Sequence, residues 1–281
     1  MKTPDKLSKI DWQRHGKRWL FAYAVLVVIM YATQRNYMYV PYDVFPNPTL
    51  IGVGDMDVIT VKTADGLEIR GLYKGPAQAD KPVIIHFHGN GGSIAIRGYR
   101  ARDYIDHGGY GYMLAEYRGY AGNPGKPTEQ GLYEDARAYI KWLAHNQKIP
   151  VSRMVFYGES LGTGIATQMA LEFPDVRALV LEAPYTSMAA VAQRHMFWLP
   201  AYWLVKDRYN NIDRIERVTA PLLVLHGQKD SIVPFSHGNS VYERARTQKR
   251  FEIFSEGGHV NLYNYNAGGK VRDFLAELVS N

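Results

Sequence analysis

The chain has 281 residues, of which 46% are hydrophobic and 21% are charged, so it is globular and has enough apolar surface for one large core. It contains no cysteine, which excludes disulfides, thiol catalysis and Cys-based zinc sites. The net charge of +6 arises mainly in residues 1–18, with six basic and two acidic side chains, and the body has no basic stripe interleaved with aromatic residues, so nucleic-acid binding is not indicated.

An uncharged apolar run, Trp19–Thr33, follows this basic tail. As a helix it would span about 22 Å, short of the ~30 Å hydrocarbon core of a bilayer. The flanking Lys17, Arg18 and Arg35 can snorkel to the interfaces. We therefore expect a transmembrane signal anchor over residues 19–36.

A cleaved signal peptide and a buried helix remain alternatives for this run. Cleavage is disfavoured because Met30-Tyr31-Ala32 places a bulky residue where a small one is needed. Since positive charge lies mainly before the run, we expect the tail in the cytoplasm and the body on the extracytoplasmic side, periplasmic or lumenal. The membrane is therefore one expected partner.

Residues 37–55 are rich in Pro, Asn, Gly and aromatic residues and are expected to form a linker or an extended lead-in to the body. A β-hairpin is predicted next, over Met56–Lys62 and Leu67–Lys74, with its turn at Ala64-Asp65-Gly66. Short apolar runs then predict strands at Pro82–Phe87, Tyr110–Tyr117, Met154–Tyr157, Ala178–Leu181, Leu222–Leu225 and Arg250–Phe254.

Helical patterns separate most of these strands. They lie at Ile94–His107, Thr128–Asn146, Thr163–Phe173, Ser236–Ala245 and Lys270–Val279. The side chain of Thr128 is expected to cap its helix. A hairpin followed by strand–helix alternation indicates an α/β fold over residues 56–281, with a mainly parallel sheet covered by helices on both faces.

The sequence Gly158-Glu159-Ser160-Leu161-Gly162 lies between a predicted strand and a helical pattern. A serine flanked by glycines at such a turn is typical of the nucleophile elbow of serine hydrolases. The glycines are needed because the tight turn strains the backbone and brings neighbouring segments close. The N-terminus of the following helix offers N–H groups where an oxyanion would form.

Further short motifs accompany Gly158–Gly162, namely Phe87-His88-Gly89-Asn90-Gly91-Gly92, Tyr117-Arg118-Gly119-Tyr120, Gly125-Lys126-Pro127, Leu225-His226-Gly227-Gln228-Lys229-Asp230, Val233-Pro234 and Gly257-Gly258-His259. Through these stretches, residues 55–281 resemble the α/β-hydrolase superfamily, and the nearest likeness is to its single-span, membrane-anchored hydrolases, which include acyl-protein thioesterase-like and carboxylesterase-like members. The resemblance implies an α/β-hydrolase fold with catalytic residues in the order Ser–Asp–His. No cofactor is expected.

Ser160 is the expected nucleophile, and it needs a base within hydrogen-bond reach. Among nine histidines, His259 follows an apolar strand and two glycines and completes the Ser–Asp–His order, so it is the expected base. Asp230, on a turn after a buried strand, is the expected acid that orients the imidazole. Asp213 and Glu182 remain weaker alternatives.

The oxyanion hole is expected to use the backbone N–H groups of Leu161 and, by the resemblance, Asn90. The sequence His86-Phe87-His88 has the spacing of some metal sites, and alternation along a strand would put both rings on one face. No carboxylate follows at ligand spacing and no H-E-x-x-H occurs, so we expect no metal site.

Residues 185–211 separate two predicted strands and are longer than a minimal connection. Pro200 should split them into two helical pieces. A simple crossover helix would account for part of this segment, and we expect the excess to form a lid over Ser160. Its apolar density suggests contact with an acyl chain or with the membrane surface, through Phe197, Trp198, Tyr202 and Trp203.

These features predict a membrane-anchored serine hydrolase that cleaves carboxylic esters or thioesters of a small-molecule or lipid-like acyl substrate, through an acyl-enzyme on Ser160. A serine peptidase of prolyl-oligopeptidase-like type remains an alternative, as does a catalytically silent binding protein on the same fold. Dehalogenase and epoxide hydrolase reactions are disfavoured, because such relatives use Asp where this chain has Ser160. The oligomeric state is left open.

Overall fold

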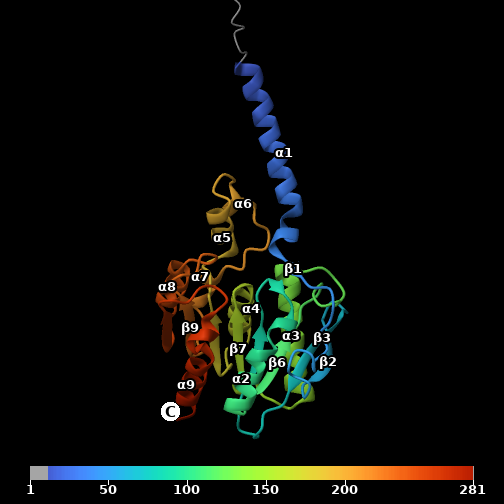
Figure 1. Ribbon diagram of the computed structural model, residues 1–281, viewed down its shortest axis with the longest axis vertical. Helices are drawn as coiled ribbons and strands as arrows, with labels where there is room; N and C mark the ends of the chain where they lie inside the picture. Colours follow the sequence, from blue (N-terminus) through green and yellow to red (C-terminus); the bar gives the residue numbers. More distant parts are fainter. Residues whose placement is uncertain (1–11, 281) are drawn as a thin grey trace, which may run out of the picture.

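The structure, a computed structural model, describes residues 12–280, so most of the expected basic tail lies outside the described residues. Within that range an eight-stranded sheet forms the centre of the body (Figure 1), in the order β2-β3-β6-β4-β7-β8-β9-β10. The strands are β2 (Asp57–Lys62), β3 (Glu68–Lys74), β4 (Val83–Phe87), β6 (Gly111–Ala115), β7 (Met154–Glu159), β8 (Ala178–Glu182), β9 (Leu222–Gly227) and β10 (Lys249–Phe254). β3 pairs antiparallel with β2 and β6, and the other neighbours pair in parallel. The predicted mainly parallel sheet with an N-terminal hairpin is confirmed.

Helices cover both faces of the sheet (Figure 1). They are α2 (Gly98–Gly108) and α9 (Ala267–Ser280) on one face, and α3 (Glu129–Asn146), α4 (Leu161–Glu172) and α8 (Phe235–Arg244) on the other. Along β4, Val83 and Ile85 face the α3 side and Ile84 faces the α2 side. Because alternate side chains of a strand point to opposite faces, a sheet buried on both sides needs the continuous apolar runs that the sequence contains.

The helix starts depend on local capping. Thr128 Oγ1 accepts a hydrogen bond from the backbone N–H of Gly131 at 3.0 Å, so it caps α3 as predicted.

The single helix expected at Ile94–His107 instead divides into a 3-10 turn, η1 (Ile94–Ile96), and α2. Two further 3-10 turns are η2 (Val151–Arg153) and η3 (Leu262–Tyr265).

The segment 37–55, expected to be a linker or an extended lead-in, packs on the body. The short strand β1 (Val40–Pro41) pairs in parallel with β5 (Gly91–Gly92). Tyr39 and Val53 are buried in the two hydrophobic clusters of the core. The composition of segment 37–55 correctly indicates irregular backbone. Whether the segment is buried depends on the few apolar side chains that it contains.

The N-terminal helix α1 (Trp12–Met38) projects away from the body (Figure 1). Its stretch His15–Met38 has 24 residues and a mean hydropathy of 1.2, and none of its most apolar window is buried, which excludes a core helix. At about 36 Å this stretch is long enough to cross a membrane. At the base of α1, Arg35 pairs with Asp207 at 2.7 Å, and the hydroxyls of Tyr39 and Tyr209 lie 2.9 Å apart.

The segment expected to form a lid, residues 185–211 and called the lid below, leaves the sheet after β8 and rises beside α1 (Figure 1). Pro200 divides it as expected, because it lies between α5 (Met188–His195) and α6 (Ala201–Leu204). The chain then returns to the body through α7 (Asn211–Ile215). The lid is therefore attached to the body at both ends, and its middle lies beside the apolar helix.

Candidate active site

Ser160 lies at the sharp turn between β7 and α4. Its φ of 49° and ψ of −112° are strained values for a residue with a side chain. A Cβ on Gly162 would lie 1.9 Å from the carbonyl oxygen of Phe87, and one on Gly158 would lie 2.5 Å from that of Gly162. Both glycines are therefore required by close backbone approach, as the motif predicts.

The structure brings Ser160, His259 and Asp230 together at the carboxyl ends of the parallel strands. His259 Nε2 lies 3.0 Å from Ser160 Oγ, and His259 Nδ1 lies 2.7 Å from Asp230 Oδ2. Asp230 follows β9 and His259 follows β10, which are parallel neighbours, so both loops leave the sheet at the same edge. This arrangement can accept the serine proton on an imidazole that a carboxylate holds in place.

Asp230 is held as an anion. Its Oδ1 accepts backbone N–H bonds from Ile232 at 2.9 Å and Val233 at 2.8 Å, and His226 Nε2 lies 3.4 Å from Oδ2. Burial alone would raise the pKa of this carboxyl, but hydrogen bonds from His226 and His259 outweigh it and hold the pKa below the usual range. Sequence reasoning missed the contact from His226, whose i, i+4 spacing to Asp230 was the available signal.

The weaker acid candidates have other partners. Glu182 accepts hydrogen bonds from Arg100, with Nη1 at 2.5 Å and Nη2 at 3.1 Å. Asp213 is exposed and accepts a hydrogen bond from the side chain of Asn210. Neither therefore orients the imidazole of His259.

His86 and His88 are engaged separately. The hydroxyl of Tyr112 lies 2.9 Å from His86 Nδ1, while His88 Nε2 lies 2.7 Å from Glu116. Burial lowers the pKa of His86 to about 4, although Glu159, 3.3 Å from its Nε2, opposes the shift. Among residues 12–280, no group of three or more His, Asp or Glu side chains is arranged to hold a metal ion.

The two predicted oxyanion donors lie on segments that meet at Ser160. Leu161 is the first residue of α4, where a backbone N–H has no partner within the helix. A Cβ on Gly89 would lie 3.5 Å from Ser160 Cβ, so the loop that contains Asn90 passes beside the serine. Asn90 O accepts from Val40 N and Tyr120 Oη, and its Nδ2 donates to Met38 O at 2.9 Å. The position of this loop is thereby fixed.

A buried ion-pair cluster beneath the elbow was not predicted. Arg97 donates to both carboxylate oxygens of Glu159, at 3.2 and 2.9 Å, and Arg100 lies 3.7 Å from the same carboxylate. Although burial acts to raise it, these cations hold the pKa of Glu159 well below the usual range. Nothing local distinguishes Arg97 from a surface arginine, so the sequence offered no signal for it.

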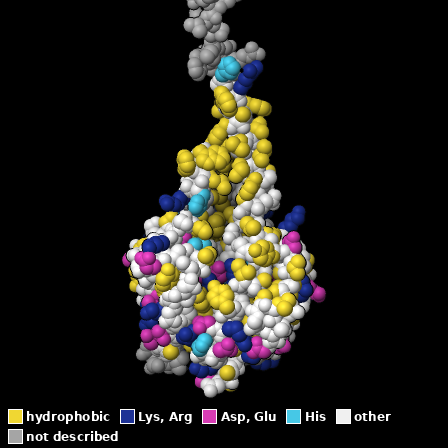
Figure 2. Space-filling model, in the orientation of Figure 1, with side chains coloured by type: hydrophobic (Ala, Val, Ile, Leu, Met, Phe, Trp, Pro, Cys, Tyr) yellow, Lys and Arg dark blue, Asp and Glu magenta, His cyan; other side chains and the backbone are white. Residues whose placement is uncertain are grey.

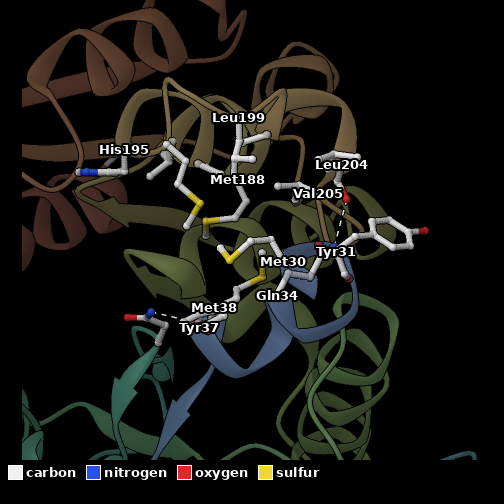
Figure 3. Close-up of a pocket in the computed structure, with 15 residues that line it drawn as sticks. Met30, Tyr31, Gln34, Tyr37, Met38, Met188, His195, Leu199, Leu204 and Val205 are labelled. Carbon is white, nitrogen blue, oxygen red and sulfur yellow. Dashed lines mark hydrogen bonds between the residues drawn. The ribbon is translucent and has the colours of Figure 1, made fainter. Parts of the chain in front are cut away.

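The prediction for the four lid aromatics named either an acyl chain or the membrane surface as their contact. Phe197, Trp198, Tyr202 and Trp203 are exposed and do not line the pocket beneath the lid. That pocket, of about 260 Å³, lies between the inner side of the lid and the base of α1 (Figure 3). The lid side of this pocket is lined mainly by aliphatic and methionine side chains, among them Met188, Met196 and Leu199.

A mainly parallel sheet with Ser, Asp and His side chains meeting at its carboxyl edge defines the class of α/β-hydrolase-fold proteins. The family model described as alpha/beta hydrolase fold matches residues 82–212, and the chain belongs to this family.

The similar proteins include esterases and a lipase. The chain is 37% identical over 238 residues to the uncharacterized protein Rv2307c of Mycobacterium tuberculosis, covering 83% of each chain. It is 30% identical to the lysophosphatidylserine lipase ABHD12 of Danio rerio, over 63% of this chain and 50% of that one. The solved esterase Pf2001 of Pyrococcus furiosus has a TM-score of 0.68 at 20% identity, over 85% of this chain and 98% of that one, and shows the fold.

Proposed function

We propose that the protein is a serine hydrolase that cleaves carboxylic esters or thioesters through an acyl-enzyme on Ser160. The observation that carries this proposal is the position of His259, whose two ring nitrogens lie within hydrogen-bond distance of Ser160 and Asp230. The similarity to a lysophosphatidylserine lipase supports an acyl ester as substrate.

In the first half of the reaction, Ser160 Oγ attacks the acyl carbon while its proton moves to His259 Nε2. The oxyanion that forms accepts hydrogen bonds from the backbone N–H groups of Leu161 and Asn90. Asp230 stabilises the resulting imidazolium. When the tetrahedral adduct collapses, the alcohol or thiol leaves with the proton from His259.

In the second half, a water molecule attacks the acyl-enzyme and gives one proton to His259. Collapse of this second adduct releases the carboxylic acid and returns the proton to Ser160 Oγ. The sequence of steps needs no group beyond the triad, the backbone donors and water.

We also propose that α1 anchors the protein in a membrane, with its N-terminal end in the cytoplasm and the body on the other side. The length and hydropathy of His15–Met38 support the anchor. The cluster of basic residues before the apolar run supports the orientation.

Labelling with a short fluorophosphonate tests the proposed chemistry. The wild-type protein should be labelled covalently, and Ser160→Ala should abolish the label. The matched control is Ser152→Ala, because Ser152 is exposed in η2 at the opposite end of β7, and it should label like the wild type. Absence of labelling in the folded wild type would favour a catalytically silent binding protein.

A substrate panel then separates the remaining reactions. Ester, thioester and amide substrates of graded acyl length should show esters or thioesters cleaved fastest. Faster cleavage of peptide amides would instead support the peptidase alternative.

A further inference from the structure

α1 and the lid are hydrogen-bonded to each other at two well-separated levels. At the base of α1, Gln34 Nε2 donates to Leu204 O at 3.1 Å, and its Oε1 accepts from Lys206 N at 2.8 Å. Eleven residues earlier, Tyr23 Oη donates to Trp198 O at 3.0 Å. Eleven helical residues span about 16 Å, so the lid follows α1 for about half the thickness of a hydrocarbon core.

The outer surface of both segments is apolar. Trp19 on α1 is 76% exposed, and Phe197 and Trp203 on the lid are 81% and 78% exposed. Figure 2 shows hydrophobic side chains gathered over α1 and the lid, while charged side chains are spread over the body. Exposed apolar patches mark contact with a membrane or with another protein, and the continuity of this patch with the apolar helix α1 favours the membrane.

The inner surface of the same pair forms the pocket. Met30 and Met38 on α1 face Met188 on the lid across it (Figure 3), and Met196 and Leu199 complete the wall on the lid side. Methionine side chains are apolar and adapt their shape, so this surface suits a flexible hydrocarbon chain. The volume of about 260 Å³ is close to the lower end of ligand pockets, which fits one chain better than a bulky lipid.

The pocket borders the loop that passes beside Ser160. Asn90 lines the pocket, and its side chain is hydrogen-bonded to the last residue of α1, Met38. The preceding residue, Gly89, lies against Ser160. A chain held between α1 and the lid therefore ends beside the loop that carries a proposed oxyanion donor.

We propose that α1 is a wall of the acyl-binding site as well as an anchor. The pocket holds one long acyl chain of a membrane lipid, which enters from the bilayer between α1 and the lid and presents its ester to Ser160. This inference rests on the proposed function, because it names the substrate class of that same site.

Pocket-narrowing variants of the full-length protein in detergent micelles test the proposal. The readout is kcat/KM for 4-nitrophenyl butyrate and 4-nitrophenyl palmitate. Met30→Trp on α1 and Met188→Trp on the lid should each lower the palmitate value by about tenfold more than the butyrate value, because chain length is discriminated by pocket volume. Ile29→Trp is the control, because Ile29 is on the same helical turn, 50% exposed and outside the pocket.

The proposal would be overturned if Met30→Trp left the ratio of palmitate to butyrate kcat/KM unchanged. It would also be overturned if Ile29→Trp changed this ratio as much as Met30→Trp does. Butyrate hydrolysis and labelling by the short fluorophosphonate show whether each variant is folded and active. If the wild type is neither labelled nor able to hydrolyse 4-nitrophenyl butyrate, the proposed function itself fails. This result is distinct from failure of the pocket assignment, in which the wild type remains active.

A second measurement needs no variant. A long-chain fluorophosphonate with a diazirine near the end of its chain attaches to Ser160 and is then photolysed in phosphatidylcholine vesicles. We expect adducts on peptides that contain Met30–Met38 and Met188–Met196. Adducts confined to other peptides, with Ser160 fully labelled, would contradict the pocket assignment.

Discussion

Arg97 links the residue before the candidate nucleophile to the glycine-rich loop beside it. Its guanidinium holds the Glu159 carboxylate on one side, and its Nη1 donates to Gly91 O and Ser93 O, each at 3.0 Å, on the other. The elbow and the loop carry the two proposed oxyanion donors. We therefore expect Arg97 to be a positioning residue that fixes the elbow relative to the loop.

Arg97→Lys should lower kcat by about 10²-fold with little change in KM, because a lysine keeps the charge but cannot hold the carboxylate and both carbonyls at once. Steady-state kinetics with a short ester measures kcat and KM separately. Urea unfolding measures the stability of the variant. The control Arg102→Lys should behave like the wild type, because Arg102 lies in α2, the helix that starts directly after Arg97, but is paired with Asp55 at the surface. A loss of stability with kcat intact would mean that Arg97 has only a structural role.

Asp230→Asn should lower kcat by about 10⁴-fold, because the amide cannot stabilise the imidazolium and favours the wrong tautomer of His259. The comparison is Asp213→Asn, which removes the exposed carboxylate first considered as an alternative acid and should change kcat less than about twofold. Equal activity in the two variants would remove Asp230 from the mechanism.

Gly162→Ala should destabilise the protein by more than about 3 kcal/mol, because the new methyl would collide with the backbone carbonyl of Phe87 rather than with a movable side chain. Gly75→Ala is the matched substitution, since its nearest neighbour would be Tyr73 Oη at an ordinary 3.5 Å. Urea unfolding midpoints of the two variants give the comparison. A stable, active Gly162→Ala protein would show that the elbow is less tightly packed than described.

Acid should weaken the fold through His86. Its folded pKa of about 4 lies below the ordinary value of about 6.5, so between these pH values the unfolded chain binds more protons and stability falls as the pH falls. The loss amounts to about 3 kcal/mol at most. His86→Gln should flatten the dependence of the unfolding free energy on pH in this window, while His145→Gln, at an exposed position of α3, should keep the wild-type slope. Identical slopes in all three proteins would exclude His86 as the source.

Membrane topology follows from the charge distribution around α1. In sealed vesicles with the cytoplasmic side inward, added protease should digest the body and leave an N-terminal tag protected. Digestion of the body only after the vesicles are lysed would reverse the proposed orientation.

The sequence by itself determined the strand–helix order, the parallel sheet, the elbow and the identity of the three side chains that meet there. These features are encoded locally, because apolar periodicity and glycine spacing reflect what each segment needs for its own burial and turn geometry. Met30, Gln34 and Met38 are spaced four residues apart and therefore share one face of α1, but this spacing does not indicate which segment the face contacts.

Only the tertiary structure decided that segment 37–55 packs on the body, that the aromatic residues of the lid are exposed, and that Arg97 is buried against Glu159. It also decided that α1 and the lid share a pocket. Each of these depends on contacts between residues far apart in the chain, and an apolar or charged side chain has the same local pattern whether it meets solvent, lipid or a distant segment of its own protein.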